Sequence, residues 1–232
     1  MKKQPVRAPG LATAATGDRG RLFVLAGVNG AGKSSVAGAA VRAAGGEYFN
    51  PDEATARIMA VNPGATLSQA NVAAWLQGKR LLKRAIAERL NYAFETTLGG
   101  STITRLLDQA LDARVEVHMR YVGLQGVDLH IARVRTRVAE GGHDIPEEKI
   151  RERYVHSRHN LIRLLPRLTD LTIFDNSAES PPEQGGRPEP RLLLRTATGA
   201  VLQTAPLDSI PEWAKPIVMT ALSTLADPCR RN

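Results

Sequence analysis

The sequence predicts an α/β fold built on a mainly parallel β-sheet, and three observations lead to this prediction. An apolar segment, 22–26, runs into the motif G-x-x-x-x-G-K-S over 27–34 and then into helical sequence. Further along, short apolar segments alternate with amphipathic helical ones. Polar residues follow several of the apolar segments, at 29–35, 50–53, 95–97 and 175–177. In a parallel sheet such positions share one edge, where ligands bind.

The individual elements are predicted from apolar periodicity, caps and breakers. Strands are expected at about 21–27, 48–49, 92–94, 115–122 and 171–174. Helices are expected at about 33–43, from Pro51 onward, and at 67–90, 101–113, 127–140 and 146–165. Pro51 followed by two acidic residues is typical of a helix start. The predicted class is a P-loop NTPase three-layer sandwich with a mainly parallel five-stranded sheet, an arginine-rich helical lid and a C-terminal β-hairpin plus helix.

The chain is expected to divide into a main domain with short flanking segments. Residues 1–19 are predicted to be a flexible tail, and 20–177 the P-loop domain with its lid at about 127–165. Residues 178–190, rich in Pro, Gly and Glu, are typical of a linker. A hairpin at 191–195 and 200–204 and a helix at about 212–225 are expected to pack on the main domain as the segment 191–232.

The composition constrains the cellular compartment and the class of binding partner. A single cysteine, Cys229, excludes an internal disulfide framework and is typical of a reducing compartment, so a cytoplasmic location is expected. No apolar run approaches the roughly 20 residues of a membrane span. The formal net charge of +8 could indicate nucleic-acid binding. However, residues 131–168 alone hold nine Lys or Arg against five Asp or Glu with Tyr154 as their one aromatic residue, which favours a phosphate-binding lid over a nucleic-acid surface.

The glycine-rich motif predicts a site for a nucleoside triphosphate. Its glycines let successive backbone N–H groups point at phosphates, and the following helix adds its positive N-terminal end. Lys33 is expected to reach the β- and γ-phosphates, and the Ser34 hydroxyl to bind Mg²⁺. The residues predicted to bind ATP are Gly27, Asn29, Gly30, Ala31, Gly32, Lys33, Ser34 and Ser35.

Two carboxylates at strand ends are candidates for the remaining chemistry. Asp52 follows the second strand and is predicted to act as the general base toward a substrate hydroxyl, the alternative being that it only caps the next helix. Glu95 ends the third strand and is the candidate for the Mg²⁺ shell or for substrate binding, the alternative being a surface acid. No strand presents the usual apolar run followed by Asp, so a second metal-side carboxylate is not identified.

The lid arginines are candidates for charge stabilisation. Any single charged helix residue is usually just solvated, but a cluster of guanidinium groups suits a transferring phosphoryl group. Arg153 and Arg158 flank Tyr154, and Arg137 precedes a Gly-Gly-His sequence whose His143 could contact substrate or simply belong to a loop.

As an ordered set, these motifs resemble the zeta-toxin-like P-loop kinases over about residues 21–177. The set comprises GVNGAGKSS from Gly27, FNPDE from Phe49, FETT from Phe94, RVAEGGH from Arg137, IPEEKI from Ile145, Arg153-Tyr154 and Asp175-Asn176-Ser177. The resemblance implies that Asp52 is the catalytic aspartate, that Lys33 is the phosphate-loop lysine, and that Arg137 and Arg153 stabilise the phosphoryl group in transfer. It implies that Glu95 and Thr97 bind substrate; we add His143 and Arg158 to that set. The lid spacing departs from that of the founding toxins.

Toxins of this family phosphorylate a sugar hydroxyl of UDP-N-acetylglucosamine, and a small helical antitoxin blocks their nucleotide site. The resemblance therefore implies an ATP- and Mg²⁺-dependent kinase of a nucleotide sugar. Two alternatives stay open at this point: a kinase of another hydroxyl, on a nucleoside, dinucleotide or polynucleotide end, and an ATPase or switch without an acceptor. The sequence leaves the acceptor, the antitoxin and the oligomeric state undetermined.

Overall fold

The computed structural model describes residues 11–12, 19–34, 36, 48–178 and 189–225. Within them seven strands form one sheet in the order β1-β3-β2-β4-β5-β6-β7. The strands are β1 (Leu11–Ala12), β2 (Arg21–Ala26), β3 (Asn91–Thr96), β4 (Glu116–Gly123), β5 (Asp170–Asp175), β6 (Arg191–Ala197) and β7 (Ala200–Thr204). The fold is therefore α/β, as predicted, but the sheet of the described residues has seven strands and not the predicted five, because the C-terminal hairpin and Leu11–Ala12 join it.

The centre of the sheet is parallel. Strand β2 lies between β3 and β4 and pairs in parallel with both, and β4 pairs in parallel with β5. Leu22, Val117 and Leu171 on these strands are fully buried and lie on the same face of the sheet, in the core shared with the helices. All four strands consequently end at the same edge, and the glycine-rich loop leaves the sheet from its middle.

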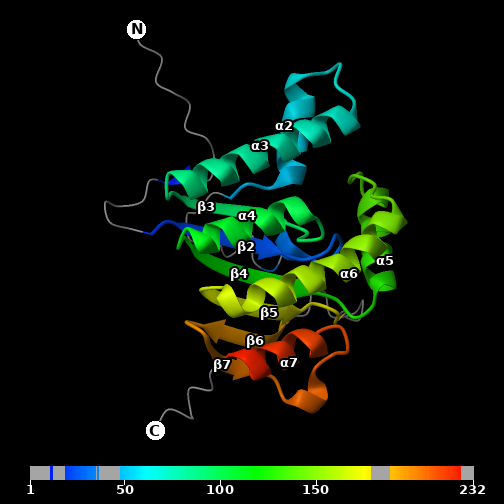
Figure 1. Ribbon diagram of the computed structural model, residues 1–232. Helices are drawn as coiled ribbons and strands as arrows, with labels where there is room; N and C mark the ends of the chain where they lie inside the picture. The colour runs from blue at the N-terminus through cyan, green and yellow to red at the C-terminus, as the bar shows by residue number, and fades with distance from the viewer. Residues whose placement is uncertain (1–10, 13–18, 35, 37–47, 179–188, 226–232) are drawn as a thin grey trace.

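Helices cover one face of this sheet. They are α2 (Pro51–Val61), α3 (Leu67–Ala87), α4 (Ser101–Asp112), α5 (Val127–Ala139), α6 (Glu147–Leu164) and α7 (Lys215–Thr224). Figure 1 shows α3, α4, α6 and α7 side by side in front of the strands, with the α2–α3 hairpin and the α5–α6 pair reaching beyond the sheet edge. In the described parts of the chain, no helix combines the length and apolar character that crossing a membrane requires.

Asn50 starts α2 and so fixes the position of Asp52. The Asn50 side-chain oxygen accepts hydrogen bonds from the backbone N–H groups of Asp52 (2.9 Å) and Glu53 (3.4 Å). Pro51 occupies the first turn, where its missing N–H costs nothing. Because the cap uses the Asn50 side chain, the Asp52 carboxylate does not serve as the cap of this helix.

The C-terminal hairpin extends the sheet. Strand β6 pairs antiparallel with β5, and β7 pairs antiparallel with β6. Trp213, which is buried, lies against Gly123 so closely that a Cβ on that glycine would overlap the indole ring. The Trp213 indole N–H donates to Asp175 Oδ1 at 3.2 Å, which turns this strand-end carboxylate toward the C-terminal segment.

Three details differ from the sequence prediction or lie beyond it. In place of the predicted strand 48–49, the structure has a single parallel bridge between Phe49 and Phe94, because Asn50 is already the cap of α2. Leu11–Ala12, placed in the predicted N-terminal tail, pairs with the outer edge of β3. Most of the predicted helix 33–43, and most of the predicted linker 178–190, lie outside the described residues.

Candidate active site

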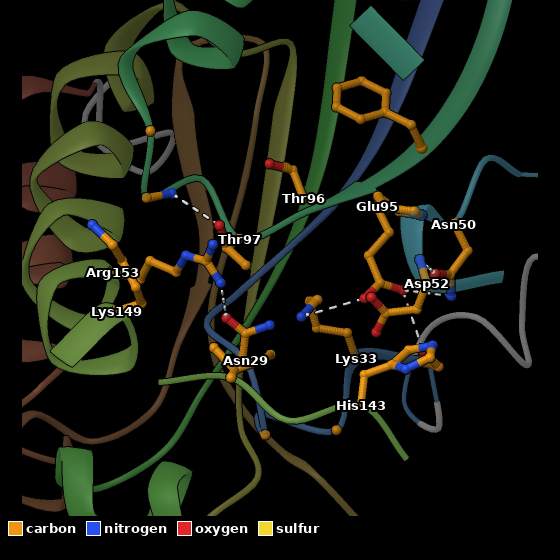
Figure 2. A pocket seen from close by; sticks show the side chains of 18 of the residues that line it. Asn29, Lys33, Asn50, Asp52, Glu95, Thr96, Thr97, His143, Lys149 and Arg153 are labelled. Carbon is orange, nitrogen blue, oxygen red and sulfur yellow. Dashed lines mark hydrogen bonds and ion pairs between the residues drawn. The ribbon is translucent and has the colours of Figure 1, made fainter. Parts of the chain in front are cut away.

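A large cleft opens at the carboxyl ends of the parallel strands. Its volume is about 1690 Å³, and it is lined by the glycine-rich loop, the start of α2, the middle of α3, the loop after β3 and the α5–α6 lid (Figure 2). Sites for one small ligand usually measure roughly 300–1,000 Å³. The cleft is therefore large enough for a nucleotide and a second substrate together.

The loop after β2 has a backbone that other residues would not adopt without strain. Gly27 and Gly30 have φ angles of 144° and 80°. A Cβ on Gly30 would lie 2.5 Å from the His130 carbonyl oxygen, and one on Gly27 would overlap the carbonyl of Val122. The loop is thus packed tightly onto β4 and α5, in the form expected of a phosphate cradle.

Lys33 and Glu95 form an ion pair at the floor of the cleft. The Lys33 ammonium lies 3.3 Å from Glu95 Oε1, and the two side chains are only 7% and 13% exposed. The second carboxylate oxygen, Oε2, accepts hydrogen bonds from the Ser34 hydroxyl (3.2 Å) and the Asn50 amide (3.4 Å). Strand β3, which carries Glu95, directly neighbours β2. These contacts bring the two predicted Mg²⁺ ligands, Ser34 and Glu95, together.

On the α2 side of the cleft, Asp52 faces the lid. Arg137 Nη1 of α5 lies 3.5 Å from Asp52 Oδ2, with the two side chains 38% and 55% exposed. Arg137 Nη2 also donates to the backbone oxygen of His143 at 3.0 Å, which holds the loop between the lid helices. The Nε of Arg137 is buried and has no hydrogen-bond partner.

Arg153 of α6 reaches across the cleft to the glycine-rich loop. Its Nη1 donates to the Asn29 side-chain oxygen at 2.8 Å (Figure 2). Burial lowers the pKa of Arg153, while the carboxylates of Glu152 and Asp52 act in the opposite direction. A guanidinium stays charged in proteins, so Arg153 presents a partly desolvated positive charge beside the loop.

A match to the family model described as Zeta toxin spans residues 12–180, which is well over half of the chain. The chain belongs to the Zeta toxin family. A protein of Haemophilus influenzae, described as an uncharacterized protein, is 30% identical over 140 residues, covering 58% of this chain and 92% of that one. The family assignment confirms the resemblance that the ordered motifs predict.

Solved structures with the same fold include toxin–antitoxin and related complexes. The native AvrRxo1-ORF1:-ORF2 complex matches with a TM-score of 0.63 at 16% identity, covering 91% of this chain and 72% of that chain. The same complex with ATP matches at 0.61 and 15%, covering 91% and 78%. The PezAT chromosomal toxin–antitoxin system of Streptococcus pneumoniae matches at 0.50 and 14%, covering 70% of each chain. Because these sequences are only 14–16% identical to this chain, the similarity establishes a shared fold and nothing about function.

Most residues predicted for this Zeta toxin family site line one cleft. Among the described residues these are Asn29, Gly30, Gly32, Lys33, Ser34, Asp52, Glu95, Thr97, Arg137, His143 and Arg153. Arg158 does not line it: its guanidinium lies over the Tyr154 ring, 4.1 Å from the centroid, and its Nε donates to the Tyr154 carbonyl. Ser35 lies outside the described residues.

Other residues line or brace the site although the sequence assigned them no individual role; Asn176 belongs to the strand-end set 175–177. Asn176, after β5, donates to the Ala31 carbonyl at 2.9 Å and so braces the loop; its place at a strand end is the signal that points to it. Trp75 and Lys79 of α3 line the cleft, with the Lys79 ammonium 4.9 Å from the Trp75 ring centroid. Their helical spacing alone resembles an ordinary amphipathic face.

His130 lies beneath the loop as a neutral imidazole. It is 1% exposed, and its Nδ1 donates to the Asn29 carbonyl at 2.8 Å. Burial is the main cause that lowers the pKa of His130 to about 4, with the bond to Asn29 acting the other way. The loop thus rests on a group that the fold holds uncharged.

This burial predicts an acid-sensitive contribution to stability. Below the unfolded-state pKa of about 6.5 the unfolded chain binds a proton that the native chain resists, so stability falls as the pH drops from about 6.5 toward 4. Between pH 7 and pH 5 the loss from His130 should be about 2 kcal/mol. Urea unfolding of the wild type and of His130→Gln at both pH values checks this.

The pH dependence of stability must be compared between the wild type and His130→Gln because His118 acts in the opposite direction. Its hydrogen bond to Asp170 raises the pKa of His118, so this histidine stabilises the native state as the pH falls. The contribution of His118 cancels when the two pH dependences are subtracted. Equal pH dependences for wild type and His130→Gln would show that His130 does not supply the acid-sensitive term.

Proposed function

We propose that the chain is an ATP-dependent kinase that transfers the γ-phosphoryl group to a sugar hydroxyl of a nucleotide sugar such as UDP-N-acetylglucosamine. The observation that carries the proposal is that one cleft holds both a phosphate-binding loop and a carboxylate that can act as a base. The phosphate loop with Lys33 and the Asp52 carboxylate, which is paired with Arg137, both line this cleft. A hydrolase or switch has no need of a carboxylate placed to receive the proton of an alcohol.

The residues of the loop fit ATP and Mg²⁺. The tightly packed glycines curl the loop as a phosphate cradle requires, although the N–H groups of Gly27 and Ala31 already donate to backbone oxygens. The Lys33 ammonium can exchange Glu95 for the β- and γ-phosphates. Ser34 and Glu95 offer adjacent oxygens, and Mg²⁺ usually takes one or two such ligands together with phosphate oxygens. When bound, Mg²⁺ neutralises phosphate charge. Among the described residues there is no group of three or more His, Cys, Asp or Glu that could hold a metal by itself.

The residues of this chain would carry the transfer as follows. Asp52 accepts the proton of the acceptor hydroxyl while the oxygen of that hydroxyl bonds to the γ-phosphorus. The bond from this phosphorus to the β–γ bridging oxygen breaks, and ADP is released. Lys33, Arg137 and Arg153 stabilise the negative charge on the oxygens in transfer. The lid, which carries both arginines, also limits the access of water, so the hydroxyl is favoured as the acceptor.

Features of the α2–α3 side support a nucleotide-containing acceptor. Trp75 offers an aromatic surface to the cleft, and Lys79 beside it offers a positive charge suited to a diphosphate. Thr97 and His143 line the same cleft and are proposed to contact this substrate. The neighbour described as the PezAT toxin–antitoxin system supports, as a further part of the proposal, a small antitoxin partner for this chain.

Mass spectrometry tests the proposal directly. The protein is incubated with Mg·ATP and a panel of UDP-sugars, nucleosides, dinucleotides and oligonucleotide ends, and the products are weighed. A UDP-sugar heavier by one phosphoryl group is the expected result. Phosphorylation of a different acceptor would replace the nucleotide-sugar assignment, whereas ATP loss with no phosphorylated acceptor would identify an ATPase and remove the role of Asp52.

A further inference from the structure

We infer that Asn29 is a positioning residue for Arg153, so that the phosphate loop itself sets the place of a lid arginine. The inference rests on the proposed function, in which Arg153 contacts the phosphoryl group in transfer. Asn29 acts through Arg153 and need not touch the substrate with its side chain. The two residues are far apart in sequence, one in the loop after β2 and the other on α6.

The contacts of Asn29 join the loop to both lid helices. Its side-chain oxygen accepts from Arg153 Nη1 of α6 at 2.8 Å, and its backbone oxygen accepts from His130 Nδ1 of α5 at 2.8 Å. Replacing the Asn29 side chain would therefore cut the link to α6 and leave the backbone link to α5 intact.

The path of the Arg153 side chain is confined on its other side by the loop after β3. A Cβ on Gly99 would lie 2.7 Å from Arg153 Cγ and 2.9 Å from Arg153 Cβ, so the absence of a side chain at position 99 is what leaves room for the arginine. In Figure 2 the Arg153 guanidinium extends from its helix to Asn29, which lies at the end of this path. An arginine loses rotamer freedom when it is fixed, and here part of that loss has already occurred before ATP binds.

Arg153 is held by a neutral amide, whereas the other two cations proposed to stabilise the phosphoryl group are paired with carboxylates. Lys33 and Arg137 are paired with the carboxylates of Glu95 and Asp52. Arg153 is instead held by an amide oxygen, which orients the guanidinium without neutralising it. Its positive charge, which the Glu152 and Asp52 carboxylates offset only from a distance, is consequently left largely for phosphate oxygens, as a stabiliser of developing negative charge requires.

Two measurements on Asn29→Ala test the inference, and the first needs no substrate. Phenylglyoxal modifies guanidinium groups, and peptide mapping reports the rate at each arginine. We expect Arg153 to react several-fold faster in Asn29→Ala than in the wild type, with the exposed Arg57 of α2 as an internal reference. An unchanged rate at Arg153 would mean that Asn29 does not hold this side chain.

The second measurement is phosphoryl transfer to the acceptor that the panel identifies. Asn29→Ala should lower kcat about 10- to 100-fold, with KM for ATP and thermal stability changed little, because the backbone N–H groups that bind phosphates remain. In the background of Arg153→Ala the same substitution should have almost no further effect. Additive losses, or an unchanged kcat in Asn29→Ala, would overturn the positioning role.

An acidic substitution separates position from charge. Asn29→Asp should keep Arg153 as slow to react with phenylglyoxal as in the wild type, yet lower kcat, because the carboxylate cancels the positive charge. Wild-type activity in Asn29→Asp would overturn the argument from the neutral partner. If the wild-type protein phosphorylates no acceptor, the proposed function fails and the catalytic part of the inference fails with it. The phenylglyoxal rates would still decide whether Asn29 holds Arg153.

Discussion

Replacing Asp52 with Asn should lower kcat for phosphoryl transfer by about 10³-fold while leaving ATP affinity close to that of the wild type. A positioned general base contributes roughly 10²- to 10⁴-fold, and an amide cannot accept the proton of the hydroxyl. The fold should tolerate the change, because the cap of α2 uses the Asn50 side chain and only the backbone N–H of residue 52. Single-turnover transfer rates and nucleotide titration measure the two quantities.

Glu53→Gln is the matched control for this prediction. Glu53 belongs to the same first helical turn and carries the same charge, but it does not line the cleft. Both variants lose one favourable charge near the helix N-terminus, worth about 0.3–1 kcal/mol of stability. Only Asp52→Asn should lose transfer. Normal transfer by Asp52→Asn, or equal losses in the two variants, would remove Asp52 as the base.

Replacing Lys33 with Met should strongly slow phosphoryl transfer and also destabilise the free protein. Loss of the cation that faces the β- and γ-phosphates should lower kcat by about 10²- to 10³-fold. In the absence of nucleotide the same change leaves Glu95, only 13% exposed, without its cationic partner. Since Ser34 and Asn50 still donate to this carboxylate, we expect a loss of about 1–3 kcal/mol in the free energy of unfolding.

The double variant Lys33→Met with Glu95→Gln separates the two effects. Removing the negative charge should restore most of the stability lost in Lys33→Met, because no unpaired charge is left buried. Transfer should not return, since both groups face the phosphates in the proposed complex. Urea unfolding and transfer assays on the four proteins of this cycle give the answer. A Lys33→Met protein as stable as the wild type would show that the ion pair contributes nothing to the free state.

The parts of the fold that follow from local sequence were predicted well. The run 22–26 with its glycine-rich loop, and the start of α2 at Pro51 before two acidic residues, carry their signals in neighbouring residues, and the structure confirms both. The pairing of Leu11–Ala12 with β3 could not be foreseen, because it depends on an available edge that another part of the chain provides. The same holds for Trp213 against Gly123, since the two lie far apart in sequence.

In the candidate site too, some features follow from local sequence and others depend on contacts between distant parts of the chain. Strand ends predicted that Lys33, Ser34 and Glu95 would meet, because parallel strands end at one edge. Helical spacing could not rank the lid arginines. Arg153 is distinguished by Asn29 and Arg137 by Asp52, and both contacts depend on how the lid is placed over the loop. Arg158, which looked equivalent in sequence, lies on Tyr154 instead.

The antiparallel extension of the sheet bears on where this protein can be shortened. The match to the family ends at residue 180, yet β6 hydrogen-bonds along the whole of β5, and the buried side chains of Leu193, Leu194 and Ile217 belong to the main core. A chain cut at the family boundary would leave β5 as a bare hydrophobic edge, which is a template for aggregation. It would also remove Trp213 from Gly123 at the end of β4. The segment that matches the family is therefore shorter than the segment that folds as one unit.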